Sequence, residues 1–274
     1  MTKNDIVKVS VPISPAAKNL ARLWLSWQGS SALPHMYEAA LVTMLRVFST
    51  HEVVIVSSEL RQVKPWYPRV WNMSNADLTR KLTRVHPERT WDQFLTQLQT
   101  APQAHTADFR RIALLYAYGG TYSDMDAFWL RSPPAQFVVT TADPAFISNG
   151  VIAVQMPEHP LFYRALFDMP AVYNPRAWTS IGGHLIASAM QTLSQGEQKS
   201  FTKIHYLDMY AINWQDATAC FTSDHCPITA SQVLRGSSYQ LHMFGKLTNI
   251  ANGAVPAVDS MYNAVLQQLE ARVH

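Results

Sequence analysis

The N-terminal part of the chain holds the pattern that most restricts its fold. Residues 20–27 form an apolar segment bounded by Gly29, which is typical of a buried strand. Residues 34–49 place Pro34 near the start of an amphipathic helical pattern, and residues 52–57 form a β-branched run that indicates a second buried strand. A strand, a helix and a strand in this order predict a β-α-β unit, so we expect an α/β domain with a mostly parallel sheet.

The rest of the chain carries weaker local patterns. Residues 1–18 predict an irregular lead-in, and residues 60–90 predict loops with one or two short helices. Residues 145–155 contain Asn149-Gly150, a usual signal for a hairpin turn, so we expect strand, turn and strand there. The other expected helices span about 90–100, 106–118, 160–167, 181–192 and 260–271, and the other expected strands span 121–124, 137–140 and 239–244.

Composition indicates a well-packed globular chain. Of the 274 residues, 48% are hydrophobic and 15% are charged, so the chain can bury a large core and long disorder is not expected. The net charge of +3 comes from dispersed Lys and Arg, which gives no indication of a nucleic-acid partner. We find no internal boundary and expect one domain over residues 1–274.

Two cysteines, Cys220 and Cys226, lie six positions apart. A zinc site would need two further ligands, and only His225 is close in sequence. We favour two free thiols in a reducing compartment, with a local disulfide as the alternative.

The sequence gives no signal for secretion or for crossing a membrane. The first 20 residues contain charges and prolines instead of an apolar signal core, and no run of 18 apolar residues occurs. We therefore expect a cytoplasmic chain with peripheral membrane contact at most, although it could be the trimmed domain of an anchored enzyme.

Two carboxylates separated by one residue are the clearest functional feature. Asp124 and Asp126 flank Met125, so on a regular strand their side chains share one face. Two carboxylates on one face repel each other, and such a pair persists when a cation or an array of sugar hydroxyls balances the charge. The preceding Gly119-Gly120 supplies the backbone freedom to end a strand at a crevice.

The acidic pair ends a longer run that resembles a known family. The run contains Asp108-x-x-Arg111, Leu115-Tyr116, Tyr118-Gly119-Gly120-Thr121-Tyr122 and Asp124-x-Asp126. It is similar to the sugar-binding region of DXD-containing glycosyltransferases. That group includes initiating mannosyltransferases, α-1,4-galactosyl- and N-acetylglucosaminyltransferases, capsular polysaccharide enzymes and, more distantly, the clostridial glucosylating toxins.

Weaker similarity extends to both sides of this run. Ser148–Val151, His159-Pro160, Trp178 and Gly182-Gly183 resemble a second block of the family, in which a proline commonly follows the glycine that matches Gly182. Near the N-terminus, Leu23-Trp24 takes the place of a His-x-Ile-Trp strand, without the histidine.

The resemblance implies a GT-A fold, which is a Rossmann-like sheet flanked by helices, and a retaining transfer of a hexose-type sugar. It implies a divalent cofactor, Mn²⁺ or Mg²⁺, and a nucleotide-sugar donor, with UDP favoured over GDP. The acceptor would be a glycan, a glycolipid or a protein. Residues 20–130 would bind the donor, and residues 131–274 would serve the acceptor and complete the metal site.

The resemblance also implies roles for individual residues. Asp126 would bind the metal directly, and Asp124 would reach ribose or sugar hydroxyls and bind the metal through water. Asp108 and Arg111 would bind the donor sugar; without the surrounding run, an exposed ion pair would be the better interpretation of these two residues. His242 would complete the metal site, since a neutral imidazole binds Mn²⁺.

Four further residues are candidates for donor binding. Trp24 would stack on the nucleobase, with core packing as the open alternative. Tyr122 and Asn149 would contact sugar or diphosphate, and Lys246 would pair with the diphosphate. Trp178, Gly182 and His184 are weaker candidates for the acceptor side.

Two other functions compete with transfer. A phosphatase of the haloacid-dehalogenase type also uses a DxD strand, but that motif follows the first strand and needs a later acidic pair, which this chain lacks. A non-catalytic nucleotide-sugar or glycan-binding module of the same fold is the other alternative.

Overall fold

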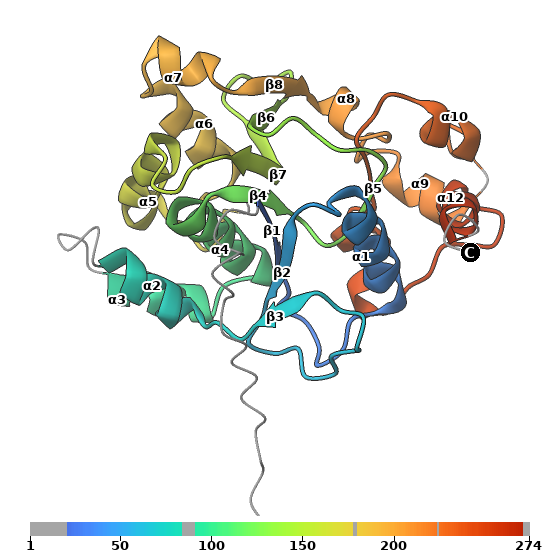
Figure 1. Ribbon diagram of the computed structural model, residues 1–274, viewed down its shortest axis with the longest axis horizontal. Coiled ribbons are helices and arrows are strands. Elements are labelled where there is room, and N and C mark those ends of the chain that lie inside the picture. Colours follow the sequence, from blue (N-terminus) through green and yellow to red (C-terminus); the bar gives the residue numbers. More distant parts are fainter. Residues whose placement is uncertain (1–20, 84–90, 178–179, 224, 271–274) are drawn as a thin grey trace, which may run out of the picture.

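The computed structural model describes residues 21–83, 91–177, 180–223 and 225–270 (Figure 1). The expected irregular lead-in over residues 1–18 lies outside these residues. The strands are β1 (Arg22–Ser26), β2 (Glu52–Val56), β3 (Arg69–Trp71), β4 (Gly120–Ser123), β5 (Ala127–Trp129), β6 (Phe137–Thr140), β7 (Ile147–Val154), β8 (Thr202–His205) and β9 (Gln240–His242).

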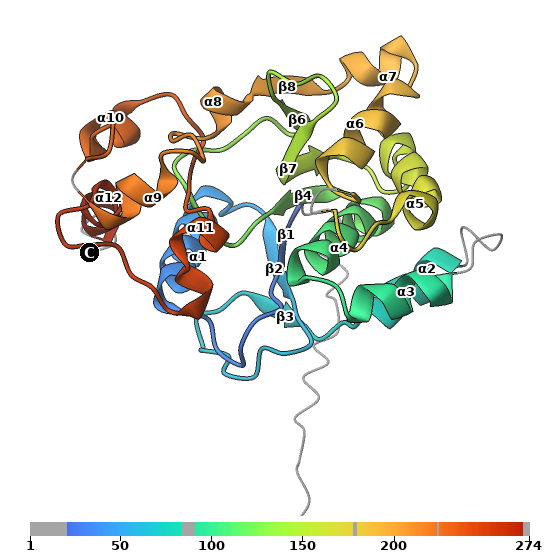
Figure 2. The ribbon, with the colours of Figure 1, turned by 180° about the vertical axis from the view of Figure 1, so that it is seen from behind.

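Helices surround the strands on both sides (Figures 1 and 2). They are α1 (His35–Val47), α2 (Asn75–Thr83), α3 (Trp91–Gln99), α4 (Gln103–Tyr118), α5 (Pro160–Val172), α6 (Gly183–Gln191), α7 (Gln195–Lys199), α8 (Tyr206–Met209), α9 (Ala217–Thr222), α10 (Ala230–Arg235), α11 (Gly245–Thr248) and α12 (Met261–Glu270), with a 3₁₀ turn at Ile250–Asn252.

The main sheet has seven strands in the order β3-β2-β1-β4-β7-β6-β8. Strands β3, β2, β1 and β4 are parallel, as are β6 and β8, while β7 runs antiparallel to both β4 and β6. The predicted α/β fold with a mostly parallel sheet is therefore confirmed. A separate two-stranded ribbon pairs β5 with β9, with Ala127 opposite His242.

The predicted β-α-β unit forms the centre of this sheet. Strand β1 pairs with β2 in parallel, with Leu23 opposite Val53, and α1 connects them after Pro34 at its N-cap. The chain then adds β3 on the side of β2 and returns to add β4 on the other side of β1. This reversal of strand order is a topological switch point, where the carboxyl ends of the strands leave a crevice for ligands.

The sheet separates two hydrophobic layers. Leu23 and Leu25 of β1 face the layer that holds α1 and the C-terminal helices, while Trp24 faces the layer of α2–α6. Figure 1 shows these helix groups on opposite sides of the strands. The alternation along β1 is that of a strand buried on both faces, which explains its continuous apolar sequence.

The structure corrects three local expectations. Residues 145–155 do not form a hairpin, because β7 runs without interruption and the backbone of neither Asn149 nor Gly150 has the positive φ that a tight hairpin turn needs. Strand β7 pairs with β4 on one edge and with β6 on the other, and this pairing outweighs the local preference of Asn149-Gly150 for a turn. The short strands β3 and β5 were not predicted, since three residues are too few to show a period.

The cysteines form a disulfide. Cys220 on α9 is bonded to Cys226, and their Cα atoms lie 4.3 Å apart. The expectation of free thiols is therefore wrong and the alternative holds. Disulfides are typical of oxidising compartments, which argues against the expected cytoplasmic location.

Within the described residues, no helix combines the length and the apolar character that a membrane crossing requires.

Candidate active site

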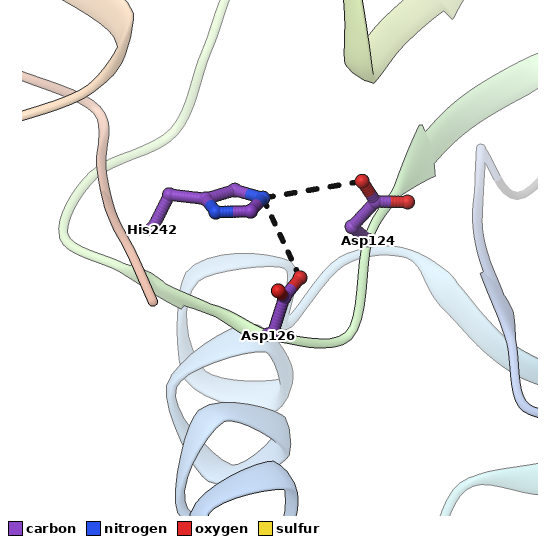
Figure 3. Close-up of side chains that lie close together, drawn as sticks. All are labelled: Asp124, Asp126 and His242. Carbon is purple, nitrogen blue, oxygen red and sulfur yellow. Dashed lines mark ion pairs between the residues drawn. The ribbon is translucent and has the colours of Figure 1, made fainter. Parts of the chain in front are cut away.

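Three candidate ligands from two distant segments meet at the carboxyl end of β4. Asp124 was expected at the end of a strand, but β4 ends at Ser123, so Asp124 and Asp126 both lie in the bend between β4 and β5. His242 ends β9. Pairing of Ala127 with His242 fixes this meeting, because it places the imidazole beside the bend. Figure 3 shows all three side chains pointing into one space.

The distances between these side chains suit a shared cation. His242 Nε2 lies 3.4 Å from Asp126 Oδ1 and 3.9 Å from Asp124 Oδ2 (Figure 3). One ligand atom from each of the three residues lies within 4.8 Å of the others. Among the described residues, this is the one group of three or more His, Cys, Asp or Glu side chains that is close enough to hold a metal.

Each carboxylate has one oxygen already engaged. Arg111 Nη2 donates to Asp124 Oδ1 at 2.8 Å, and the Gly245 N–H donates to Asp126 Oδ2 at 2.6 Å. These bonds orient the carboxylates and leave Asp124 Oδ2 and Asp126 Oδ1 facing His242. Supported carboxylates of this kind are what a divalent ion with oxygen ligands requires.

The imidazole is oriented by the backbone. The Phe244 N–H donates to His242 Nδ1 at 2.9 Å, so the neutral ring carries its proton on Nε2, toward the carboxylates. The backbone of Phe244 is left-handed, with φ 50°, and this conformation lets the turn direct the N–H groups of Phe244 and Gly245 to the site. A cation at Nε2 requires the ring proton to move to Nδ1 and the Phe244 hydrogen bond to open.

A second polar cluster adjoins the carboxylates. Arg111 Nη1 donates to Asp108 Oδ1, and Asn149 Nδ2 donates to the same oxygen at 2.7 Å. The side chains of Arg111 and Asp108 are 4% and 12% exposed, so this pair is not the exposed helix-surface pair considered from sequence. Arg111 links both clusters, since it also pairs with Asp124.

Burial and charge shift the pKa values of these groups. Burial raises the pKa of Asp108 above its usual range, although Arg111 acts in the opposite direction. Burial alone would raise the pKa of Asp124, but Arg111 and then His242 outweigh it and hold that pKa low. Burial alone would lower the pKa of His242, but Asp126 and then Asp124 raise it. The site therefore keeps negative charge at Asp124, next to groups that compensate it.

Two predicted donor contacts are core residues instead. Trp24 is 0% exposed, its indole N–H donates to Gly119 O at 2.7 Å, and its ring stacks on Trp71 with centroids 5.6 Å apart. It therefore has no free face for a nucleobase. Tyr122 is 1% exposed and lies beneath the Arg111 guanidinium, 4.5 Å from its ring centroid, so it supports Arg111 and does not face a ligand.

The remaining candidates divide between the site and its surroundings. Asn149 and Gly182 lie beside Asp108. Lys246 is exposed on α11, which follows His242, and its contact with diphosphate stays a prediction. His184 is exposed and bonds Ala145 O at 2.8 Å, and Trp178 lies outside the described residues.

Sequence reasoning missed two neighbours of the site. Tyr210 is 2% exposed, and its ring meets the His242 ring edge-on at 5.4 Å. Gly150 faces Asp124 and His242 from β7. No local pattern marks Tyr210, whereas a glycine in an apolar strand could have indicated a close approach.

One cavity of about 420 Å³ lies elsewhere, along α1 and beside α10 and α12. None of the candidate site residues lines it. Cavity size therefore does not locate this site, which is recognised by its converging polar atoms.

The donor set fits a divalent metal. Carboxylate oxygens and one imidazole nitrogen form a common set for Mn²⁺ or Mg²⁺, and here one such atom from each residue lies within 4.8 Å of the others. His242 fits after the proton shift described above. The residues therefore suit such an ion.

Comparisons with known proteins agree with this geometry. Residues 34–143 match the family model of the glycosyltransferase sugar-binding region containing DXD motif. Residues 154–269 match the alpha 1,4-glycosyltransferase conserved region. The first match contains Asp108, Arg111, Asp124 and Asp126, and the second contains His242.

Two curated relatives of low sequence identity are glycosyltransferases by name. Human alpha-1,4-N-acetylglucosaminyltransferase is 21% identical over 171 residues, which are 58% of this chain and 50% of that protein. Mouse lactosylceramide 4-alpha-galactosyltransferase is 25% identical over 173 residues, which are 61% of this chain and 46% of that protein. The chain thus spans about half the length of the curated relatives it matches.

A solved structure, the PaToxG glycosyltransferase, aligns with a TM-score of 0.48 and 13% identity over 66% of this chain and 72% of that one. The DXD run predicted from sequence and the two family matches agree on one assignment. The chain therefore resembles the DXD-containing glycosyltransferases, with residues 34–143 matching one glycosyltransferase family model and residues 154–269 another.

Proposed function

We propose that the chain transfers a hexose-type sugar from a nucleotide-sugar donor to an acceptor, with retention of anomeric configuration. One observation carries the proposal: Asp124 Oδ2, Asp126 Oδ1 and His242 Nε2 converge beside the buried Asp108–Arg111 pair. The first group suits a metal-bound diphosphate, and the second offers hydrogen bonds to a sugar.

The chemistry of the donor explains why both groups are needed. Cleavage of the sugar–phosphate bond concentrates negative charge on the departing nucleoside diphosphate, and a bound divalent cation stabilises that charge. Asp124, Asp126 and His242 would hold Mn²⁺ or Mg²⁺ there. Their neighbours keep them in place, because Arg111 holds Asp124 and the Gly245 N–H holds Asp126.

Asp108 is the residue best placed to bind a hydroxyl group of the donor sugar. Its Oδ1 is engaged by Arg111 and Asn149, whereas its Oδ2 faces Gly182. We assign Oδ2 as an acceptor for a sugar hydroxyl, and Arg111 as the residue that fixes the carboxylate and balances its charge.

The relatives support a donor class and an acceptor class for this proposal. The names of the two curated relatives describe N-acetylglucosaminyl and galactosyl transfer, and this favours a UDP-sugar over a GDP-sugar. A glycan or glycolipid acceptor agrees with these names, and a protein acceptor stays open.

Transfer can be tested with purified protein. UDP-galactose, UDP-N-acetylglucosamine, UDP-glucose and GDP-mannose would each be incubated with Mn²⁺ and with lactose or a lactosyl lipid. We expect one UDP-sugar to release UDP and to yield an α-linked product, and EDTA to stop both. Binding of UDP without turnover of any donor would instead support a non-catalytic nucleotide-sugar-binding module.

A further inference from the structure

Gly150 is a glycine at an interior position of a strand, facing the metal-ligand group. It lies in the middle of β7, where Gly150 O accepts from the Asp124 N–H at 2.7 Å. A Cβ added at this position would lie 3.0 Å from Asp124 Oδ2, 3.2 Å from the Tyr210 hydroxyl and 3.6 Å from His242 Nε2. Its φ is not positive, so the backbone does not require glycine here. The missing side chain instead leaves space beside the ligand atoms, as expected where a ligand approaches a strand closely.

Gly182 has the same relation to the second cluster. A Cβ at Gly182 would lie 2.9 Å from Asp108 Oδ2 and 3.1 Å from Asn149 Nδ2. Gly182 therefore leaves space beside the carboxylate oxygen that neither Arg111 nor Asn149 engages.

We propose that Gly150 and Gly182 are specificity-determining positions that shape two separate parts of the donor site. Gly150 keeps open the space through which the nucleoside diphosphate reaches the metal-ligand group. Gly182 keeps open the notch in which a sugar hydroxyl reaches Asp108 Oδ2. This inference rests on the proposed function and deepens it, since it assigns diphosphate and sugar to different ends of the site.

Alanine can be introduced at Gly150 and at Gly182 because the atoms nearest to the added Cβ are the ends of side chains, which can move. Gly183 is different: a Cβ there would meet the backbone oxygen of Ile147 at 2.3 Å, so its substitution would disturb the fold. Gly196 on α7 offers a matched control, because its Cβ would have only Ser194 Oγ at 4.0 Å nearby. Alanine at Gly150, Gly182 and Gly196 thus adds the same methyl group at three places.

The experiment is calorimetric titration of wild type and the three alanine variants. The probes are UDP with Mn²⁺, and the intact donor, UDP-galactose or UDP-N-acetylglucosamine, with Mn²⁺. Gly150→Ala should weaken UDP binding about tenfold or more, which corresponds to the low end of an overpacking penalty. Gly182→Ala should leave UDP binding within about twofold of wild type and weaken donor binding about tenfold. Gly196→Ala should change neither by more than about twofold.

Melting temperatures of all variants show whether the fold is kept. If Gly150→Ala has a lower melting temperature than wild type, the substitution is combined with Tyr210→Phe, because removal of the Tyr210 hydroxyl relieves the 3.2 Å contact with the added Cβ. Compared with Tyr210→Phe alone, the double variant should still bind UDP more weakly.

The outcomes separate the inference from the function beneath it. The inference alone is overturned if wild type binds UDP and Gly150→Ala binds it equally well. It is also overturned if Gly182→Ala loses affinity for UDP and for the donor to the same extent. Absence of Mn²⁺-dependent binding of UDP by wild type would overturn the proposed function and the inference with it.

Discussion

Arg111 is the residue on which both polar clusters depend, and its removal is the most informative test of how the site is built. Its guanidinium is 4% exposed, pairs with Asp108 and with Asp124 at 2.8 Å, and lies over the Tyr122 ring. Arg111→Met keeps an unbranched apolar side chain in place of the Arg stem and deletes the guanidinium with its charge. The variant leaves two carboxylates without their shared partner.

The size of the effect follows from burial. Breaking a buried ion pair by removing one partner costs about 3–5 kcal/mol, because the remaining charge stays desolvated. For a chain somewhat above 250 residues, each 1 kcal/mol lowers the melting temperature by about 2–4 °C, so Arg111→Met should melt about 6–20 °C below wild type. The assay is thermal unfolding followed by circular dichroism, without metal, at pH 7.

A matched pair on the surface provides the control. Arg80 and Asp77 have the same residue types and the same i,i+3 spacing as Arg111 and Asp108, but their side chains are 71% and 45% exposed. Arg80→Met should cost less than about 1 kcal/mol, as exposed pairs do. Equal losses of stability in Arg111→Met and Arg80→Met would refute the claim that a buried charge network organises the site.

Two further predictions concern stability outside the site. Burial would raise the pKa of Glu52, but Arg22 and then Arg69 hold that pKa below its usual range. The ionised Glu52 therefore stabilises the fold above the unfolded pKa of about 4.3, and this contribution is lost as the pH falls below that value. Urea unfolding should show Glu52→Gln less stable than wild type at pH 7, with the difference in stability narrowing as the pH falls below about 4.3. A difference that is independent of pH would contradict this assignment. Reducing the Cys220–Cys226 bond should cost about 2 kcal/mol, as loop-closure entropy predicts for so short a loop, with Cys220→Ser/Cys226→Ser showing the same loss without reductant. Wild type that unfolds at the same urea concentration with and without reductant would show that the bond does not stabilise the fold.

Local sequence was sufficient where one contiguous pattern decides the structure. The apolar run before Gly29, the proline-started helix and the β-branched run gave β1, α1 and β2, and their parallel pairing followed from their order. The DXD run likewise located the bend after β4. These features need no knowledge of distant partners.

Features that depend on distant partners were not predictable in the same way. Asn149-Gly150 has the local signature of a turn, but β4 and β6 pair with β7 on both sides and keep it extended. Trp24 is a core residue because of the layer that its strand faces, which the sequence of β1 alone does not show. The hairpin prediction was therefore wrong, and for Trp24 the alternative of core packing holds, because tertiary contacts decide both.

The site itself was predicted in part. Asp124, Asp126 and His242 were named from the motif and the resemblance, and the β5–β9 pairing brings them together. Gly150, Tyr210 and the N–H groups that orient the ligands emerged only from the structure, because backbone donors and absent side chains leave no mark in a motif.

The central claim is a metal-dependent donor site at Asp124 and Asp126, and one measurement tests it most directly. Calorimetric titration of UDP into wild type and Asp126→Asn, each with Mn²⁺ and with EDTA, reports binding without an acceptor. Exposed Asp143, changed to Asn, is the control. We expect wild type and Asp143→Asn to bind UDP only with Mn²⁺, and folded Asp126→Asn to lose that binding. Equal binding by Asp126→Asn and wild type, or binding that Mn²⁺ does not affect, would contradict the account.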